Sequence, residues 1–263
     1  MSDVGQREGA SAHIQRFVRR LAAVTEPDMQ EALWAERFQT QRTEDLLIQL
    51  SHLLAGVQRR EEPFRTAYLS LAIWLRRQAA SGGPKEEGYL RRREVYEAAS
   101  NLRDIDVMRL LLPTSPPPAA YATHIKEPHL GLQGQEITLG HRRMMARTAD
   151  RGLIGRLIFD PDPVVLQHIL DNPLTVEQDA VRVAARRPTL IPCLEVVFNH
   201  PRWGRRPEVQ RALLMNPYSP VDMGMALSPL MSKAALKAVS RDGLLSHALR
   251  RRASELLEHG RVH

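Results

Sequence analysis

The chain has 263 residues, of which 43% are apolar and 5% are aromatic, and its net charge is +7. This length and apolar content are sufficient for one or two domains with a buried core, and the single cysteine excludes an internal disulfide. Because no run of apolar residues is long enough to span a membrane and the N-terminal residues lack a signal-peptide pattern, we expect a cytoplasmic protein.

Residues 1–112 show apolar side chains at helical spacing and few alternating runs, which predicts an all-α region. Helices are expected after Ser11 to about Val24, and then over 27–38, 43–57, 61–80 and 86–111. Pro27 suits a first helical position, and Thr43 is followed by two acids that favour a helix start. We therefore expect five helices, arranged as a bundle or as helical hairpins.

Residues 113–137 differ in composition, because they contain five Pro and two Gly and show no helical period. Loops of this length inside a compact domain are uncommon and often functional. Two interpretations remain open. The segment is either an ordered strap laid across a groove or a semi-rigid linker in polyproline conformation.

Residues 138–263 contain an internal repeat. The stretch DPDPVVLQHILDNP, ending at Pro173, returns as RPEVQRALLMNP, so that Pro163 corresponds to Pro207 and Asn172 to Asn216 with an offset of 207 − 163 = 44 residues. A period of about 40 residues built from short, proline-broken helices is typical of an α-solenoid. Helices are expected over 139–147, 153–159, 163–171, 175–186, 189–199, 207–215, 219–231, 232–241 and 244–258.

The motif Asp160-Pro-Asp-Pro163, followed by an apolar helix and by Asp171-Asn-Pro173, resembles the leucine-rich repeat variant, a relative in style of HEAT repeats, over about 163–240. The resemblance implies an all-α fold in which a HEAT-like α-solenoid follows the N-terminal helical region. Members of that variant family can carry a cysteine-ligated iron–sulfur cluster. Such a cluster needs several thiolates, so we expect no cofactor in a chain whose only cysteine is Cys193.

No catalytic signature stands out in the sequence. Asp160 and Asp162 form the one close carboxylate pair with a rigid frame, which could hold a metal or do acid–base work, but residues beside a first-turn proline are more simply helix caps. Cys193 lies among apolar residues and is expected to be a buried, inert thiol. His200 follows Asn199 and is expected to cap a helix end as a cation. We predict no catalytic residue and no metal site.

The basic residues are concentrated in the repeat half, where 19 Lys and Arg stand against 12 Asp and Glu over 138–263. Aligned arginines of successive repeats could form a basic stripe, or they could be a solvated outer face. Trp203 could stack on a base or simply pack under a loop. The candidate binding residues are Arg143, Arg147, Arg151, Arg182, Arg186, Trp203, Arg205 and Arg206.

Two functions are compatible with these patterns. The first is a non-enzymatic scaffold that binds another protein on a concave repeat surface. The alternative is a nucleic-acid-binding HEAT-like protein that uses the arginines, of which a DNA glycosylase-like enzyme is the least favoured form. No membrane partner is expected, and the sequence leaves the oligomeric state open.

Overall fold

The computed structural model describes residues 3–80, 86–112 and 137–259. Over these ranges the chain contains fifteen α-helices and no strand, which confirms the all-α prediction. The chain divides into two compact units, residues 1–114 and 115–263. The strap or linker predicted over 113–137 lies outside the described residues, except for Ile137.

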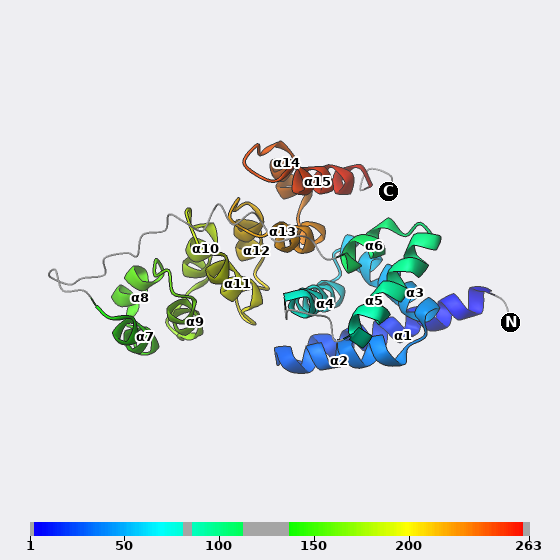
Figure 1. Ribbon diagram of the computed structural model, residues 1–263, viewed down its shortest axis with the longest axis horizontal. Coiled ribbons are helices and arrows are strands. Elements are labelled where there is room, and N and C mark those ends of the chain that lie inside the picture. Colours follow the sequence, from blue (N-terminus) through cyan, green and yellow to red (C-terminus); the bar gives the residue numbers. More distant parts are fainter. Residues whose placement is uncertain (1–2, 81–85, 113–136, 260–263) are drawn as a thin grey trace. The chain divides into compact units, whose positions relative to one another are not determined.

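The first unit is organised around its third helix (Figure 1). Its helices are α1 (Asp3–Ala23), α2 (Pro27–Thr40), α3 (Thr43–Gln58), α4 (Glu62–Ala80), α5 (Glu86–Asn101) and α6 (Ile105–Leu111). Helix α3 contacts α1, α4, α5 and α6, and its apolar stripe at Leu46, Leu50 and Leu53 is fully buried. Helix α1 begins earlier than predicted, at Asp3 rather than after Ser11.

The helix predicted over 86–111 is wrong as a single element, since the chain breaks between α5 and α6. Arg103 adopts a φ of 55°, and Asp104 caps α6 by accepting a hydrogen bond from the Val107 amide at 3.1 Å. Asp104 also accepts a hydrogen bond from the Ser51 hydroxyl at 2.5 Å. The cap therefore fixes the break against α3.

A buried arginine joins three helices of the first unit. Arg37 of α2 is 7% exposed, its Nε donates to Gln49 Oε1 of α3 at 2.8 Å, and its guanidinium lies 4.0 Å from the ring centroid of Phe17 of α1. Burial lowers the pKa of Arg37 to about 10, so the side chain stays charged at neutral pH. The aromatic face offsets part of the desolvation cost of that charge.

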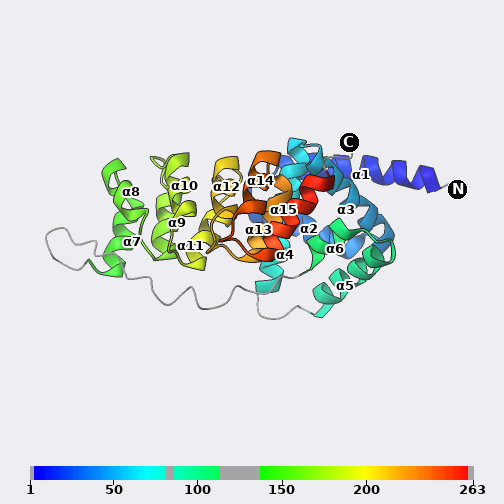
Figure 2. The same ribbon diagram turned by 90° about the horizontal axis from the view of Figure 1, so that it is seen from above.

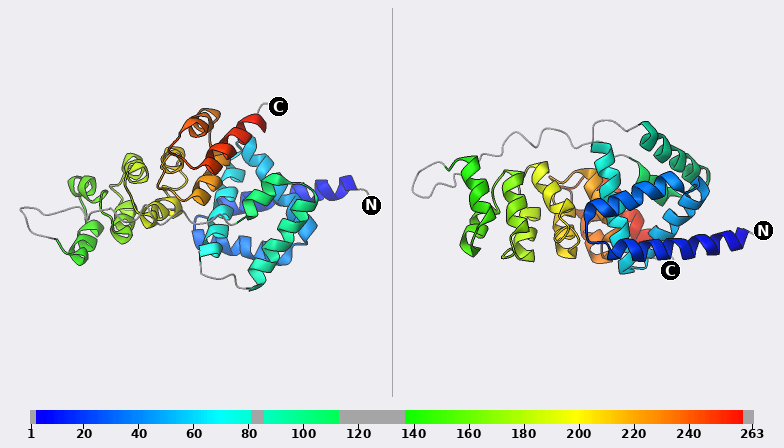
Figure 3. Two further views of the ribbon diagram at one scale, coloured as in Figure 1. Left: turned by 45° about the horizontal axis from the view of Figure 1, so that its top comes forward. Right: turned by 90° about the horizontal axis from the view of Figure 1, so that it is seen from below.

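The second unit consists of short helices that lie side by side (Figures 1 and 2), and Figure 3 shows them from two further directions. Helix α7 contacts α9, α9 contacts α11, α10 contacts α12, and α13 contacts α15. The elements are α7 (Leu139–Arg147), α8 (Arg151–Leu157), α9 (Pro163–Asp171), α10 (Glu177–Ala185), α11 (Ile191–Asn199), α12 (Pro207–Leu214), α13 (Val221–Leu227), the 3₁₀ turn η2 (Ser228–Leu230), α14 (Lys233–Arg241) and α15 (His247–His259).

The predicted helix ranges of the repeat region agree with these bounds to within a few residues. Pro163 and Pro207 stand in the first turn of α9 and α12, where a missing N–H breaks no hydrogen bond. Thr138, Asp150 and Asp162 cap α7, α8 and α9 through their side-chain oxygens. The range 219–231 differs, because it is an α-helix continued by a 3₁₀ turn.

The two copies of the repeat end in the same asparagine turn. Asn172 Nδ2 donates to the Ala149 carbonyl at 3.0 Å, and Asn216 Nδ2 donates to the Ala184 carbonyl at 2.8 Å. Both asparagines are buried. Each amide therefore satisfies a backbone acceptor near the end of an earlier helix, which would otherwise lose its hydrogen bond on burial.

The rest of each asparagine turn is also duplicated. The amide oxygen of either asparagine accepts the backbone N–H two residues further on, at 2.9 Å and 3.0 Å. The hydroxyls of Thr175 and Ser219 donate to the carbonyls of Ile169 and Leu213, respectively. The correspondence seen in the sequence is therefore a correspondence of hydrogen bonds as well.

The turn between α11 and α12 depends on a glycine. A Cβ atom at Gly204 would lie 2.2 Å from the Phe198 carbonyl oxygen and 3.0 Å from the His200 carbonyl oxygen, both of them backbone atoms. The Gly204 carbonyl accepts a hydrogen bond from Gln210 Nε2 at 2.9 Å, which ties the turn to α12. Only glycine permits this close approach of backbone to backbone.

We expect Asn172→Ala and Asn216→Ala each to lower the free energy of unfolding by about 1–3 kcal/mol, because each leaves a buried carbonyl without a donor. Chemical denaturation followed by circular dichroism measures the loss. Asn199→Ala is the matched control, since within the described part of the chain that amide donates only to Glu195, at 3.5 Å, in its own helix. Equal losses in the control and in the two turn variants would contradict the role of the turns.

Two glycine substitutions should act in opposite directions. Gly204→Ala should destabilise the chain by roughly 1–3 kcal/mol, because backbone atoms must move to admit the methyl group. Gly155→Ala should stabilise it by up to about 1 kcal/mol, because Gly155 lies within α8 and nothing lies within 4 Å of its added Cβ. Thermal unfolding compares the two, and an unchanged Tm for Gly204→Ala would refute the close approach.

Candidate functional site

The candidate arginines lie at or near helix ends of the second unit. Arg143 and Arg147 are on α7, Arg151 begins α8, Arg182 is on α10, Arg186 follows α10, and Arg205 and Arg206 precede α12. The contacts of Arg143, Arg151, Arg182 and Arg186 form two groups. One surrounds Asp160 and Asp162, and the other surrounds Asp179.

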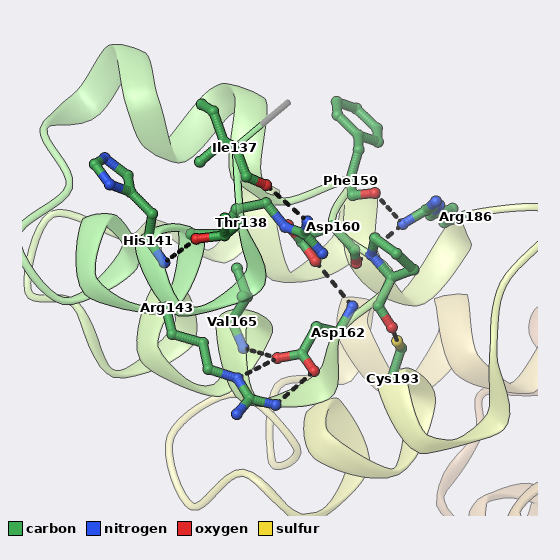
Figure 4. Close-up of polar contacts among 12 residues, drawn as sticks. Ile137, Thr138, His141, Arg143, Phe159, Asp160, Asp162, Val165, Arg186 and Cys193 are labelled. Atoms are coloured by element: carbon green, nitrogen blue, oxygen red, sulfur yellow. Dashed lines mark hydrogen bonds and ion pairs between the residues drawn. The ribbon is translucent and has the colours of Figure 1, made fainter. Parts of the chain in front are cut away.

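The first group joins α7 to the start of α9 (Figure 4). Arg143 Nε and Nη2 donate to Asp162 Oδ1 and Oδ2 at 3.1 and 2.9 Å. Asp162 Oδ1 also accepts the Val165 amide at 2.9 Å and so caps α9. The hydrogen bonds from Arg143 hold the pKa of Asp162 below its ordinary value. Asp162 therefore binds a guanidinium group and a helix start at the same time.

Asp160, the other carboxylate of the predicted pair, is fully buried. Arg142 Nε donates to Asp160 Oδ2 at 2.8 Å, and the amide of Asp162 donates to Asp160 Oδ1 at 2.9 Å. Burial raises the pKa of Asp160, against those two donors. Arg186 donates to the carbonyls of Phe159 and Asp160, so it binds backbone in this region (Figure 4).

The second group, which we call the Asp179 cluster, comprises Arg151, Leu174, Val176, Asp179 and Arg182. Asp179 is fully buried, and Arg151 donates to both of its oxygens, with Nη2 at 3.0 Å from Oδ1. The Val176 amide donates to Asp179 Oδ2 at 3.0 Å, and Arg151 Nη1 also donates to the Leu174 carbonyl at 3.3 Å. Arg182 Nη1 lies 4.0 Å from Asp179 Oδ1.

The electrostatics of the Asp179 cluster keep its carboxylate ionised. Burial raises the pKa of Asp179, but the hydrogen bonds from Arg151 and the Val176 amide outweigh it, and the pKa lies below its ordinary value. The hydrogen bond to Asp179 in turn raises the pKa of Arg151. Two arginines therefore share one buried negative charge at neutral pH.

Two of the other candidates have different partners. Arg147 Nε donates to His168 Nε2 at 3.3 Å, and Arg206 Nε lies 3.9 Å from Glu177 Oε2. Arg205 is half-buried, and burial lowers its pKa. Four of the candidate arginines each lie beside a carboxylate of the same unit: Arg143, Arg151, Arg182 and Arg206.

Trp203 does not offer a stacking surface, so that interpretation is wrong and the packing alternative is confirmed. The side chain is 2% exposed, and its Nε1 donates to the Leu170 carbonyl at 2.8 Å. The Arg202 guanidinium lies 4.1 Å from the ring centroid. An indole enclosed in this way anchors the turn between α11 and α12 to the end of α9.

His200 is a neutral hydrogen-bonding group rather than the cation predicted at this helix end. Its Nδ1 accepts the backbone amides of Arg202 and Trp203 at 3.2 and 3.3 Å, so this nitrogen carries no proton. Its Nε2 lies 3.1 Å from Asp171 Oδ1, to which it donates. Burial lowers the pKa of His200, although Asp171 opposes the shift.

Cys193 is buried, as predicted, with its Sγ 3.2 Å from the Pro161 carbonyl oxygen (Figure 4). Burial raises its pKa to about 11, so the thiol is protonated at neutral pH. Among the described residues, no group of three or more His, Cys, Asp or Glu side chains is placed to hold a metal ion. Over the same residues, no helix combines the length and the apolarity that crossing a membrane requires.

The sequence did not identify Asp179, the residue on which the second group depends. A local signal was present, because an acid at the third position of α10 can accept the N–H at the start of that helix. The pairing with Arg151 was not visible, since the two residues are 28 positions apart and belong to different helices.

Comparisons with known proteins add no identity to these observations. The sequence matches no protein-family model, and the curated proteins and the solved structures contain no match to it. Function is therefore inferred from the contacts of the residues themselves.

We expect the free energy of unfolding to fall as the pH drops below about 6.5, the value at which an unfolded histidine titrates. The reason is that the lowered pKa of His200 makes the folded chain bind this proton less readily than the unfolded chain does. Above that pH both states are neutral at this site, and its contribution is constant.

Urea denaturation between pH 7.5 and pH 5 measures this dependence. His200→Gln should flatten the curve, whereas His247→Gln is the control, because His247 is exposed on α15. A His200→Gln curve as steep as that of the unmodified chain would contradict the assignment of the neutral imidazole.

Proposed function

We propose that the chain is a non-enzymatic protein of HEAT-like helical repeats that acts as a scaffold for another protein in the cytoplasm. The observation that carries the proposal is the duplicated asparagine turn, in which the amide oxygens of Asn172 and Asn216 accept the backbone N–H two residues further on and each side-chain amide donates to a carbonyl of an earlier segment. Successive repeats that each bond to a preceding segment of the chain are typical of α-solenoids. Such stacks offer extended surfaces to protein partners.

The contacts of the buried and partly buried polar residues also support binding rather than catalysis. Asp160, Asp162 and Asp179 hold arginines and helix starts, and His200 holds the amides of a turn. Catalytic acids and nucleophiles are usually exposed to a cleft and aligned with a second reacting group. These three carboxylates instead accept hydrogen bonds from arginines and backbone amides of the same unit.

Nucleic-acid binding is the alternative, and the excess of 19 basic over 12 acidic residues in 138–263 favours it. The local contacts weigh against it, because Asp162 and Asp179 each cancel the charge of an arginine, and Trp203 is enclosed. A DNA glycosylase-like enzyme would further need a carboxylate in a base pocket. We therefore place the protein scaffold first.

Affinity co-purification of the tagged full chain from its own cell lysate tests this proposal. Parallel purifications with and without nuclease, at low and at moderate salt, separate protein partners from nucleic acid. We expect at least one protein to remain bound in stoichiometric amount after nuclease treatment at moderate salt, and the tag alone to retain none.

Loss of all bound material on nuclease treatment would overturn the proposal in favour of nucleic acid. In that case, affinity for a labelled oligonucleotide should fall steeply with salt, with a slope of about one per phosphate contacted.

A further inference from the structure

The surface of the Asp179 cluster carries more positive charge than its single carboxylate cancels. The carboxylate of Asp179 is fully buried, whereas the side chains of Arg151 and Arg182 are 50% and 51% exposed. Each arginine keeps one full charge, so the cluster has a net charge of +1. Solvent or a partner can therefore contact the two guanidinium groups but not the carboxylate of Asp179 between them.

Arg182 makes fewer contacts within the unit than Arg151 does. Arg151 makes three hydrogen bonds, two to Asp179 and one to the Leu174 carbonyl. Arg182 approaches Asp179 only to 4.0 Å and makes no hydrogen bond within the part of the chain that the structure describes. A guanidinium has five donors in a planar fork that matches a carboxylate, so Arg182 has donors available to a partner.

Exposed aliphatic side chains belong to the same cluster. Leu174 is 52% exposed and Val176 is 46% exposed. Their backbone atoms contact Arg151 and Asp179, respectively, which places both residues at the arginines rather than elsewhere on the unit. A peptide can match both the guanidinium groups and the exposed apolar side chains beside them. A phosphate backbone can match only the guanidinium groups.

We propose that the Asp179 cluster binds a short segment of a partner protein in which an Asp or Glu side chain neighbours an aliphatic residue. The partner carboxylate pairs with Arg182, and the aliphatic side chain covers Leu174 and Val176. This inference rests on the proposed scaffold function and names the chemistry of the partner. Charge complementarity selects an acidic segment, and the exposed leucine and valine select an apolar neighbour.

The same contacts separate the two arginines as experimental targets. Removing Arg151 would leave Asp179 as a buried charge without its main partner, so its loss would disturb the fold. Arg182 can be removed without stranding Asp179, because Arg151 and the Val176 amide remain. Arg182→Ala is therefore the informative variant. Lys237→Ala is its control, since it removes an equal charge from an exposed position on α14.

The experiment selects random twelve-residue peptides displayed on phage against the immobilised full chain. The most enriched sequence is then synthesised with a fluorescent label and titrated by fluorescence polarisation. We expect enriched sequences to combine Asp or Glu with Leu, Ile or Val. Arg182→Ala should weaken the binding at least about tenfold, as the loss of a charge-assisted contact does, and Lys237→Ala should not change it.

Substitutions of two exposed leucines test the aliphatic part of the Asp179 cluster. Leu174→Asp should also weaken the selected peptide at least about tenfold, because it replaces the aliphatic contact by a charge that repels the peptide carboxylate. Leu244→Asp is its control, because Leu244 is 71% exposed in the turn before α15. Unfolding temperatures of all four variants verify that each remains folded.

The outcomes distinguish this inference from the proposed function. Selected peptides that bind the Arg182→Ala and Leu174→Asp variants as tightly as the unmodified chain would overturn the cluster as the site while leaving a protein scaffold in place. Enrichment of basic or purely apolar peptides would overturn the stated partner chemistry. If no peptide is enriched and a labelled single-stranded oligonucleotide binds in an Arg182-dependent way, both the inference and the scaffold function fail.

Discussion

Short helices are marginal on their own, and the second unit depends on satisfying the polar groups at their ends. Each of its α-helices up to α14 has no more than nine residues, so most of its backbone lies within a turn or two of an end. The side-chain amides of Asn172 and Asn216 supply donors to the carbonyls of Ala149, which follows α7, and of Ala184, which lies in α10. Because the same side chains also close their own turns, each asparagine ends one helix and joins it to another.

The charged side chains of this unit, like its polar groups, are paired between elements. The chain is rich in arginine, yet Arg142, Arg143 and Arg151 each donate to a carboxylate that belongs to another element of the unit. The buried Asp179 is stable as an anion because Arg151 approaches it from a neighbouring helix. A basic composition therefore does not by itself create a basic surface. At the Asp179 cluster, two cations face one acid, which leaves positive charge for binding.

The sequence predicted most helix bounds, because the residues that set them act locally. Pro163, Pro207 and the cap Asp150 need only their own turn. Contacts between distant segments were not predictable in the same way. The pairing of Arg151 with Asp179, the enclosure of Trp203 and the neutral state of His200 depend on which helices meet. The break at Arg103 was missed because the apolar period continues across it.

Hydrogen exchange of the full chain, free and with a co-purified partner, tests the account of the binding surface most directly. We expect the partner to slow exchange in residues 151–157 and 174–185, which carry the Asp179 cluster, and to leave α14 unchanged. Slowing confined to α14 and α15, or to residues 3–112, would contradict it, because the partner would then bind where neither the paired arginines nor their aliphatic neighbours lie.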